Sequence, residues 1–236
     1  MAVNRYGKIL TLVALFGLTL GSAKEQPIRI MPLGDSITQG YRGHDSYRRE
    51  LWLKLNRAGA RVDFVGSLKK NYWGMPFHTD FDMDHEGHWG WRADQVLARM
   101  DKWAAKNVPD IVLLHLGTND IGGGQGIEET VREIEEIIMI LRKHNAKVKV
   151  LLAQIIPLAN EAASERIKKF NKQLAKLTES ISTEEAPVIL VNHFDGFDPQ
   201  TDTYDGVHPN KWGTDKMANK WYKALVGLLR LEKKKQ

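Results

Sequence analysis

The sequence predicts a single α/β domain in which a parallel sheet lies between two layers of helices. Short apolar runs alternate with amphipathic stretches five times along the 236 residues. Each run is continuously apolar, which is typical of strands buried on both faces. No internal repeat, linker or low-complexity block divides the chain. We therefore expect residues 24–236 to form one three-layer sandwich with a five-stranded parallel sheet and right-handed crossovers.

The individual elements follow from the apolar pattern. The expected strands are residues 28–33, 62–65, 111–116, 148–155 and 188–191. The expected helices are residues 46–58, 93–105, 127–144, 163–182 and 211–230. In the third helix, apolar residues recur at three- or four-residue steps and make one buried stripe. Residues 67–91 form a long irregular stretch, and loops of this length tend to carry function.

The first 23 residues have the pattern of a secretory signal peptide. Arg5 and Lys8 precede an apolar run over residues 9–20, which small residues follow at 21–23. The run is too short to cross a bilayer comfortably, because spanning takes about 20 apolar residues. We therefore expect a secreted, periplasmic or extracellular protein without membrane contact after cleavage. An uncleaved N-terminal anchor is the alternative.

Charge and cysteine content exclude several classes of protein. The formal net charge is +5, and it falls to +3 without Arg5 and Lys8. The lysine run at 233–235 reads as a solvated tail, and no cluster of basic residues indicates a nucleic-acid partner. The chain has no cysteine, which excludes disulfides, a thiol nucleophile and a cysteine-ligated metal. Export without disulfides favours a bacterial envelope or extracellular setting.

Polar residues follow the expected strands at the edge where α/β sheets bind their ligands. Ser36 follows the first strand, and a serine hydroxyl becomes nucleophilic when a base removes its proton. His208, past the last strand, can be that base, with Asp205 orienting its imidazole. Asp202 is the alternative partner. Asn119, after the third strand, can donate its amide to an oxyanion, together with the backbone N–H groups of Ser36 and Gly90.

Four sequence blocks that carry these residues resemble the blocks of SGNH (GDSL) hydrolases. They are Gly-Asp-Ser-Ile-Thr at 34–38, the segment 86–92 around Gly90, Gly-Thr-Asn-Asp at 117–120, and Asp-Gly-Val-His-Pro at 205–209. They occur in the order of the family and with similar spacing. The resemblance implies a flavodoxin-like fold, Ser36 as nucleophile, His208 and Asp205 as base and partner, and oxyanion donors Ser36, Gly90 and Asn119. It also implies no metal and no organic cofactor.

Within that family, the segments around Gly90 and His208 are most similar to the acetyl xylan esterases of carbohydrate esterase family three. The family pattern leads us to expect a small residue at position 89, and Trp89 departs from it. The resemblance implies hydrolysis of a small ester, an acetyl group on a polysaccharide or related glycan, through an acyl-enzyme. The alternatives are a lysophospholipase or thioesterase of the same family and an inert carbohydrate-binding protein on this scaffold.

Aromatic and acidic residues near the expected site carry weaker signals. Trp73, Trp89, Trp91 and Trp212 either stack on sugar rings or pack the loops down. Aromatic and polar walls predict a preference for acetate over longer acyl chains. Asp80, Asp82 and Asp84 begin like a calcium loop, but His85 occupies the glycine position, so we expect a solvated loop and no metal.

Overall fold

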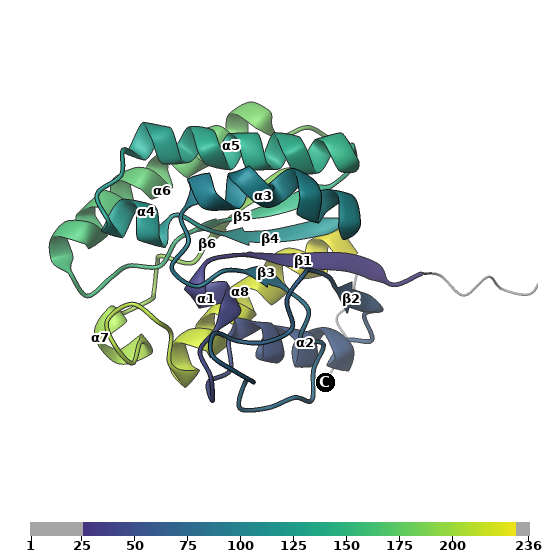
Figure 1. Cartoon of the computed structure of the whole chain (residues 1–236), viewed down its shortest axis with the longest axis horizontal. Helices are drawn as coiled ribbons and strands as arrows, with labels where there is room; N and C mark the ends of the chain where they lie inside the picture. The colour runs from purple at the N-terminus through teal and green to yellow at the C-terminus, as the bar shows by residue number, and fades with distance from the viewer. Residues whose placement is uncertain (1–25, 230–236) are drawn as a thin grey trace, which may run out of the picture.

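The computed structural model describes residues 26–229. The predicted signal peptide and the lysine run at 233–235 lie outside these residues. A parallel sheet forms the middle layer, with α3, α5 and α6 covering one face and α2 and α8 the other (Figure 1). The predicted three-layer α/β fold is confirmed.

The sheet contains six strands in the order β2-β1-β4-β5-β6, with β3 pairing with β1 off this path. All paired strands are parallel. The strands are β1 (Ile28–Gly34), β2 (Val62–Phe64), β3 (Glu86–Gly87), β4 (Ile111–His115), β5 (Lys149–Gln154) and β6 (Val188–Asn192). Five were expected from the sequence. The two-residue strand β3 falls in the stretch predicted to be irregular, because two residues are too few to show a periodic pattern.

The five predicted helices are α2 (Tyr47–Arg57), α3 (Ala93–Lys106), α5 (Ile127–His144), α6 (Glu161–Ile181) and α8 (Lys211–Leu229). Three further helices of four or five residues were not expected: α1 (Ser36–Gln39), α4 (Thr118–Gly122) and α7 (Pro199–Asp202). Each is shorter than two turns, so no apolar stripe marks it in the sequence.

Alternate residues of the central strands fill two separate cores. In β4, Val112 and Leu114 pack toward α3, α5 and α6, whereas Ile111 and Leu113 pack toward α2 and α8. This is the two-residue period of a strand, with both faces covered by helices. The apolar runs of the sequence are continuous because both faces of these strands are buried.

The strand order reverses between β1 and β4. From β1 the chain moves to β2 on one side, and it later returns to β4 and continues through β5 to β6 on the other. A crevice forms outside the carboxyl ends of the strands at such a point, and ligands of α/β proteins bind there. Ser36 and Asn119 follow the two strands on either side of this point.

Over residues 26–229, none of the helices has the length and apolar character needed to cross a membrane.

Candidate active site

Ser36 is the first residue of α1, directly after β1. Asp35 caps this helix, because its Oδ1 accepts a hydrogen bond of 3.0 Å from the amide of Ile37. Gly34 lies so close to β4 that a Cβ atom there would be 2.2 Å from the backbone oxygen of His115. Glycine is therefore required for β1 and β4 to approach at the point where they present the serine.

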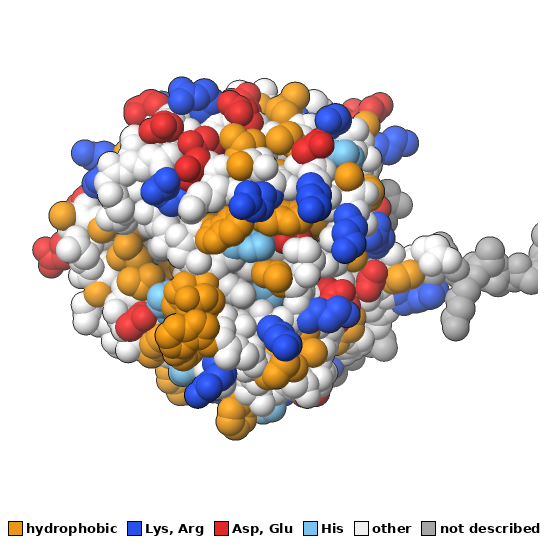
Figure 2. Space-filling view, in the orientation of Figure 1, with side chains coloured by type: hydrophobic (Ala, Val, Ile, Leu, Met, Phe, Trp, Pro, Cys, Tyr) orange, Lys and Arg blue, Asp and Glu red, His pale blue; other side chains and the backbone are white. Residues whose placement is uncertain are grey.

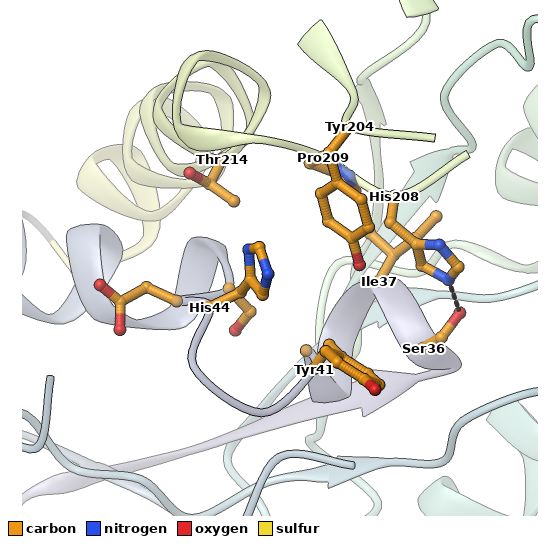
Figure 3. A pocket seen from close by; sticks show the side chains of 11 residues that line it. Ser36, Ile37, Tyr41, His44, Tyr204, His208, Pro209 and Thr214 are labelled. Carbon is orange, nitrogen blue, oxygen red and sulfur yellow. Dashed lines mark hydrogen bonds between the residues drawn. The ribbon is translucent and has the colours of Figure 1, made fainter. Parts of the chain in front are cut away.

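His208 lies in the loop between α7 and α8. Its Nε2 is 2.9 Å from Ser36 Oγ (Figure 3), and its Nδ1 is 2.7 Å from Oδ2 of Asp205. A carboxylate can only accept, so Nδ1 carries the proton. Nε2 is therefore the acceptor that faces the Ser36 hydroxyl. This arrangement can remove the proton of the hydroxyl as its oxygen attacks an electrophile.

The loop itself is closed around Asp205. Its Oδ1 accepts the backbone amides of Val207 at 3.0 Å and His208 at 2.7 Å, and the amide of Tyr204 donates to the carbonyl of His208. Burial alone would raise the pKa of Asp205, but the hydrogen bonds from His208 and Val207 outweigh it and lower the pKa. Asp205 is therefore a carboxylate at neutral pH.

Asp202, the alternative partner of the imidazole, has other contacts. Its Oδ2 accepts the amide of Asp198 at 2.8 Å and lies 2.6 Å from Nζ of Lys216. Its side chain is buried at the end of α7, where it closes the turn of that helix and joins it to Lys216 of α8. The structure brings Asp205, and not Asp202, to the imidazole.

Asn119 and Gly90 follow the two strands that flank β1. Asn119 lies in α4 after β4, and Gly90 follows β3. Nδ2 of Asn119 donates one N–H to the carbonyl of Trp91 at 2.8 Å, which fixes the direction of the amide and leaves its second N–H. Gly90 has a φ of 75°, and among residues 26–229 its own N–H makes no hydrogen bond. Both residues thus follow strands that pair with β1, and each keeps an N–H that no described residue accepts.

A pair of buried carboxyl groups lies beneath these donors. Asp35 and Asp120 are both fully buried, and Oδ2 of each has no hydrogen-bond partner among the described residues. Oδ1 of Asp120 accepts the amide of Ala93 at 2.8 Å, which links α4 to the start of α3. Burial raises the pKa of Asp35 to about 7, and burial also raises the pKa of Asp120. Burial therefore disfavours the ionised form of both carboxyl groups.

Two aromatic rings stack on the His208 imidazole. The ring of Trp89 stacks on one face, with centroids 4.4 Å apart and planes at 14°, and Tyr204 stacks at 5.7 Å and 15°. Gln39 holds Trp89 by accepting its amide at 2.7 Å. The imidazole is thus fixed by hydrogen bonds at its edges and by ring stacking. Trp89 points into the site, which the sequence could not determine.

A small pocket opens beside Ser36. Its walls include Tyr41, His44, Tyr204 and His208, and its volume is about 20 Å³. In Figure 3, Tyr204 lies between His208 and His44, and Tyr41 lies below them. This volume holds about one water molecule. Tyr41 and His44 were not singled out from the sequence, although both lie within eight residues of the serine.

The other tryptophans of the sequence analysis have different surroundings. The ring of Trp91 stacks on His88 at 4.5 Å and lies near Trp103 of α3, so it packs the loop onto that helix. Trp73 lies in the loop between β2 and β3, whereas Trp89 follows β3, and Trp73 is 72% exposed. Trp212, at the start of α8, is 67% exposed, with Nζ of Lys211 5.7 Å from its ring centroid. A role of Trp212 in substrate binding stays a prediction.

The acidic loop residues have protein partners. Asp80 forms a two-bonded ion pair with Arg49, both bonds being 2.7 Å, and Oδ2 of Asp82 accepts the amide of Phe64. Among the residues that the structure describes, no three histidine or acidic side chains are grouped as a metal site would require.

The sequence analysis did not predict that Arg48 would be buried and form a hydrogen-bond network beside the site. It is fully buried in α2 and donates to the carbonyls of Thr38, Gln39 and Met83, to Ser46 Oγ, and to Oδ1 of Asn71, at 2.8–2.9 Å. Burial lowers its pKa to about 10, so it is still charged at neutral pH. Arg48 thereby joins α1, which carries the serine, to the loop between β2 and β3, which carries Trp73.

Known proteins of one family are similar to this chain. The sequence profile of the GDSL-like lipase/acylhydrolase family matches residues 33–216. A multidomain esterase of Ruminococcus flavefaciens is 31% identical over 261 aligned positions, which cover 97% of this chain and 33% of that protein. The chain thus spans about a third of the length of this relative.

Solved structures of similar length share the fold. A carbohydrate esterase family 3 protein from Talaromyces cellulolyticus superposes with a TM-score of 0.77 at 30% identity, covering 86% of this chain and 98% of that one. A family 3 carbohydrate esterase of Clostridium thermocellum gives a TM-score of 0.73 at 33% identity, covering 87% and 98%. A mutant acetyl esterase with acetate ion gives 0.76 at 30% identity, covering 86% and 98%.

The fold and these matches define the class of carboxylic ester hydrolases with a three-layer α/β domain. The chain belongs to the GDSL-like lipase/acylhydrolase family. The resemblance to SGNH hydrolases, and to family three esterases within them, is confirmed.

Proposed function

We propose that this protein is a serine esterase that removes acetyl groups from a polysaccharide or related glycan through an acyl-enzyme. The observation that carries the proposal is the hydrogen-bonded chain from Ser36 Oγ to His208 Nε2 at 2.9 Å and from His208 Nδ1 to Asp205 at 2.7 Å. The similarity to carbohydrate esterases of family three supports the acetylated substrate.

In the first half of the reaction, Ser36 Oγ attacks the carbonyl carbon of the ester while His208 Nε2 takes the hydroxyl proton. The oxyanion that forms accepts hydrogen bonds from the backbone N–H groups of Ser36 and Gly90 and from the second N–H of Asn119. The bond to the sugar oxygen then breaks, and His208 gives its proton to that oxygen. The products are an acetyl-serine and a free hydroxyl on the glycan.

In the second half, water attacks the acetyl-serine and His208 takes a proton from it. The second oxyanion collapses, acetate leaves, and the proton returns to Ser36 Oγ. Asp205 remains ionised throughout and stabilises the imidazolium that exists at each oxyanion stage. The lowered pKa of Asp205 supports this role, because the carboxylate does not compete for the proton.

The pocket beside Ser36 supports a short acyl group. Its volume is about 20 Å³, and its aromatic and polar walls offer no apolar channel. A longer acyl chain would gain about 0.8 kcal/mol of binding free energy for each methylene only if such a channel buried it. We expect nitrophenyl acetate to be hydrolysed faster than the butyrate, and the octanoate slowest. Acetate release from acetylated xylan tests the glycan, with Ser36→Ala as the inactive control.

Two results would redirect the proposal. Preference for octanoate would favour the lysophospholipase or thioesterase alternative. Binding of xylan without release of acetate from any substrate would favour the inert carbohydrate-binding protein.

We also propose that the protein is exported after cleavage near residue 23, on the charged, apolar and small-residue pattern of residues 1–23. N-terminal sequencing of protein recovered from the periplasm or medium of an expressing bacterium tests this. An intact N-terminus in the membrane fraction would favour the uncleaved anchor.

A further inference from the structure

A row of stacked rings begins in the loop between β2 and β3, continues at Trp89 after β3, and ends at His208. Trp89 stacks on His208 with centroids 4.4 Å apart, Tyr72 on Trp89 at 4.9 Å, and Trp73 on Tyr72 at 5.2 Å. The planes of successive rings differ by 14°, 12° and 20°. We call these four rings the aromatic stack. Its last member, Trp73, lies three ring-to-ring steps from the acyl-transfer centre.

Trp73 is held in a conformation that its side chain disfavours. Its φ is 64°, and it is the only residue other than glycine with a positive φ in the part of the chain that the structure describes. It occupies the third position of the turn Asn71–Gly74, which the amide of Gly74 closes onto the carbonyl of Asn71 at 3.2 Å. Turns with a positive φ at this position favour glycine or asparagine there. Bulky residues in such a conformation are strained, and strain of this kind clusters at functional sites.

The turn is fixed from below, so the exposed ring is presented rigidly. Asn71 is buried, and its Nδ2 donates to the carbonyl of His44 at 2.7 Å while its Oδ1 accepts from Arg48 at 2.8 Å. The backbone of Tyr72 bonds to Gly40 and to Arg42, each at 2.9 Å. A loop tip held in this way loses little further freedom when a ligand binds, which favours affinity.

The surface around Trp73 is apolar and continuous with the site. Figure 2 shows a compact patch of hydrophobic side chains over the position that α1 has in Figure 1. Tyr41, which lines the pocket beside Ser36, has its ring 6.0 Å from Trp73 and 5.5 Å from Trp89. The flat face of an exposed indole fits the C–H face of a pyranose ring, and its rigidity limits the entropy lost.

We propose that Trp73 forms a second sugar-binding subsite, which holds a pyranose ring of the same glycan chain at a distance from the ring whose ester is cleaved. This inference rests on the proposed glycan substrate. The aromatic stack sets the spacing: its rings cover one another's faces, so the outer face of Trp73 is the one left for stacking. The subsite predicts that acetylated oligosaccharides are better substrates than acetylated monosaccharides.

The test compares kcat/KM for acetylated xylotetraose with kcat/KM for nitrophenyl acetate. We expect Trp73→Ala to lower the ratio of the two about tenfold, through KM for the oligosaccharide, since one aromatic contact is worth roughly a factor of ten. Phe77→Ala is the matched control, because Phe77 lies in the same loop and is 71% exposed but is outside the aromatic stack. Its ratio should match that of the wild type.

A second pair of variants checks that the strained conformation exists in solution. Trp73→Gly should unfold at a higher temperature than Trp73→Ala, although glycine normally destabilises, because glycine accepts a positive φ and alanine does not. A higher melting temperature for Trp73→Ala than for Trp73→Gly would show that residue 73 is not strained in solution. It would overturn the rigid presentation of the ring.

Failure of the subsite and failure of the proposed function give different results. An unchanged ratio in Trp73→Ala, with a wild type that hydrolyses both substrates, overturns the subsite alone. If the wild type hydrolyses neither, calorimetric titration with unacetylated xylotetraose decides. Binding that Trp73→Ala abolishes supports the subsite, and equal binding by both proteins, or Trp73-dependent binding to phosphatidylcholine vesicles instead, overturns it.

Discussion

The site has two halves of different origin. Asp35, Ser36 and Asn119 follow β1 and β4 directly and form the strand-borne half, whereas Asp205, His208 and the segment of Trp89 and Gly90 form the loop-borne half. Ser36 is 4% exposed and Asp35 is fully buried. The side chain of Asp205, in contrast, is 42% exposed. The sheet fixes Ser36 by burial, and the loops fix His208 by hydrogen bonds and ring stacking.

The two halves also treat their carboxyl groups in opposite ways. Burial raises the pKa of Asp35 to about 7. Asp205 is less buried, and its hydrogen bonds outweigh burial and lower its pKa. A site that needs a permanent anion beside its imidazole therefore takes it from an exposed loop. At the desolvated strand end, burial disfavours the ionised form of Asp35.

The largest effect is expected in the strand-borne half. Ser36→Ala removes the nucleophile and should lower kcat by about 10⁴-fold or more. The loss of one oxygen at a strand end leaves the core unchanged, so the melting temperature should match that of the wild type. Turnover of nitrophenyl acetate and circular dichroism measure the two. Near-normal turnover would contradict the assignment of Ser36.

In the loop-borne half, Asp205→Asn should lower kcat by about 10²–10⁴-fold. The amide oxygen can still accept the Val207 and His208 amides, but an amide NH₂ facing Nδ1 favours the tautomer that cannot accept from Ser36. Partial exposure lets water replace some of the lost charge, so the effect is smaller than for Ser36→Ala. If Asp202→Asn gave the larger loss in kcat, the assignment of Asp205 would be wrong.

Asn119→Ala tests whether a strand-end amide serves the transition state. We expect kcat to fall by about 10²–10³-fold with little change in KM, because the second N–H is used when negative charge develops. Steady-state kinetics with nitrophenyl acetate separate the two constants. A change confined to KM would make Asn119 a binding residue or a support for the carbonyl of Trp91.

Asp35→Asn tests the raised pKa of Asp35 through the pH dependence of the free energy of unfolding. Asp35 has a folded pKa of about 7 against an ordinary value of 3.8, so its contribution to stability is complete below pH 3.8 and is lost as pH rises through 7. Asparagine does not titrate, and it can still accept the Ile37 amide. The free energy of unfolding of the variant, relative to the wild type, should rise between pH 4 and pH 8. A difference that is constant with pH would show that Asp35 is ionised when buried.

The smallest effect concerns two tryptophans on either side of Gly90. Trp89→Ala should lower kcat about 2- to 10-fold by uncovering His208, a loss in the range of one stacking interaction. Trp91→Ala should instead act on stability, lowering the melting temperature by a few degrees, because its ring packs on His88 and near Trp103. The reverse pattern, with Trp91→Ala lowering kcat and Trp89→Ala lowering the melting temperature, would contradict these ring positions.

The strand-borne half could be predicted from the sequence almost completely. Ser36 and Asn119 directly follow apolar runs, and the carboxyl ends of parallel strands meet at one edge, so their proximity is a property of the fold. The same logic located His208, although its distance from Ser36 depends on the turn that Asp205 closes.

The loop-borne half could not be predicted in the same way. No period in the sequence indicates that Trp89 points toward His208 while Trp91, two positions later, points toward α3. That difference follows from the positive φ of Gly90 and from the hydrogen bond between Gln39 and the Trp89 amide. Tyr41 and Tyr72 were missed for the same reason, since an aromatic residue in a loop has no pattern that assigns its direction.

The buried guanidinium of Arg48 has a consequence for how such enzymes diverge. One side chain holds the backbone of Thr38 and Gln39 beside the serine and the carbonyl of Met83 in the distant loop. Exchange of the loop between relatives therefore succeeds only when the acceptors around Arg48 are transferred with it, and we expect these segments to be inherited together. The turn of Trp73 rests on this network through Asn71, but the exposed Trp73 side chain forms no hydrogen bond to it, so that side chain can change between descendants while the chemistry beneath it stays the same.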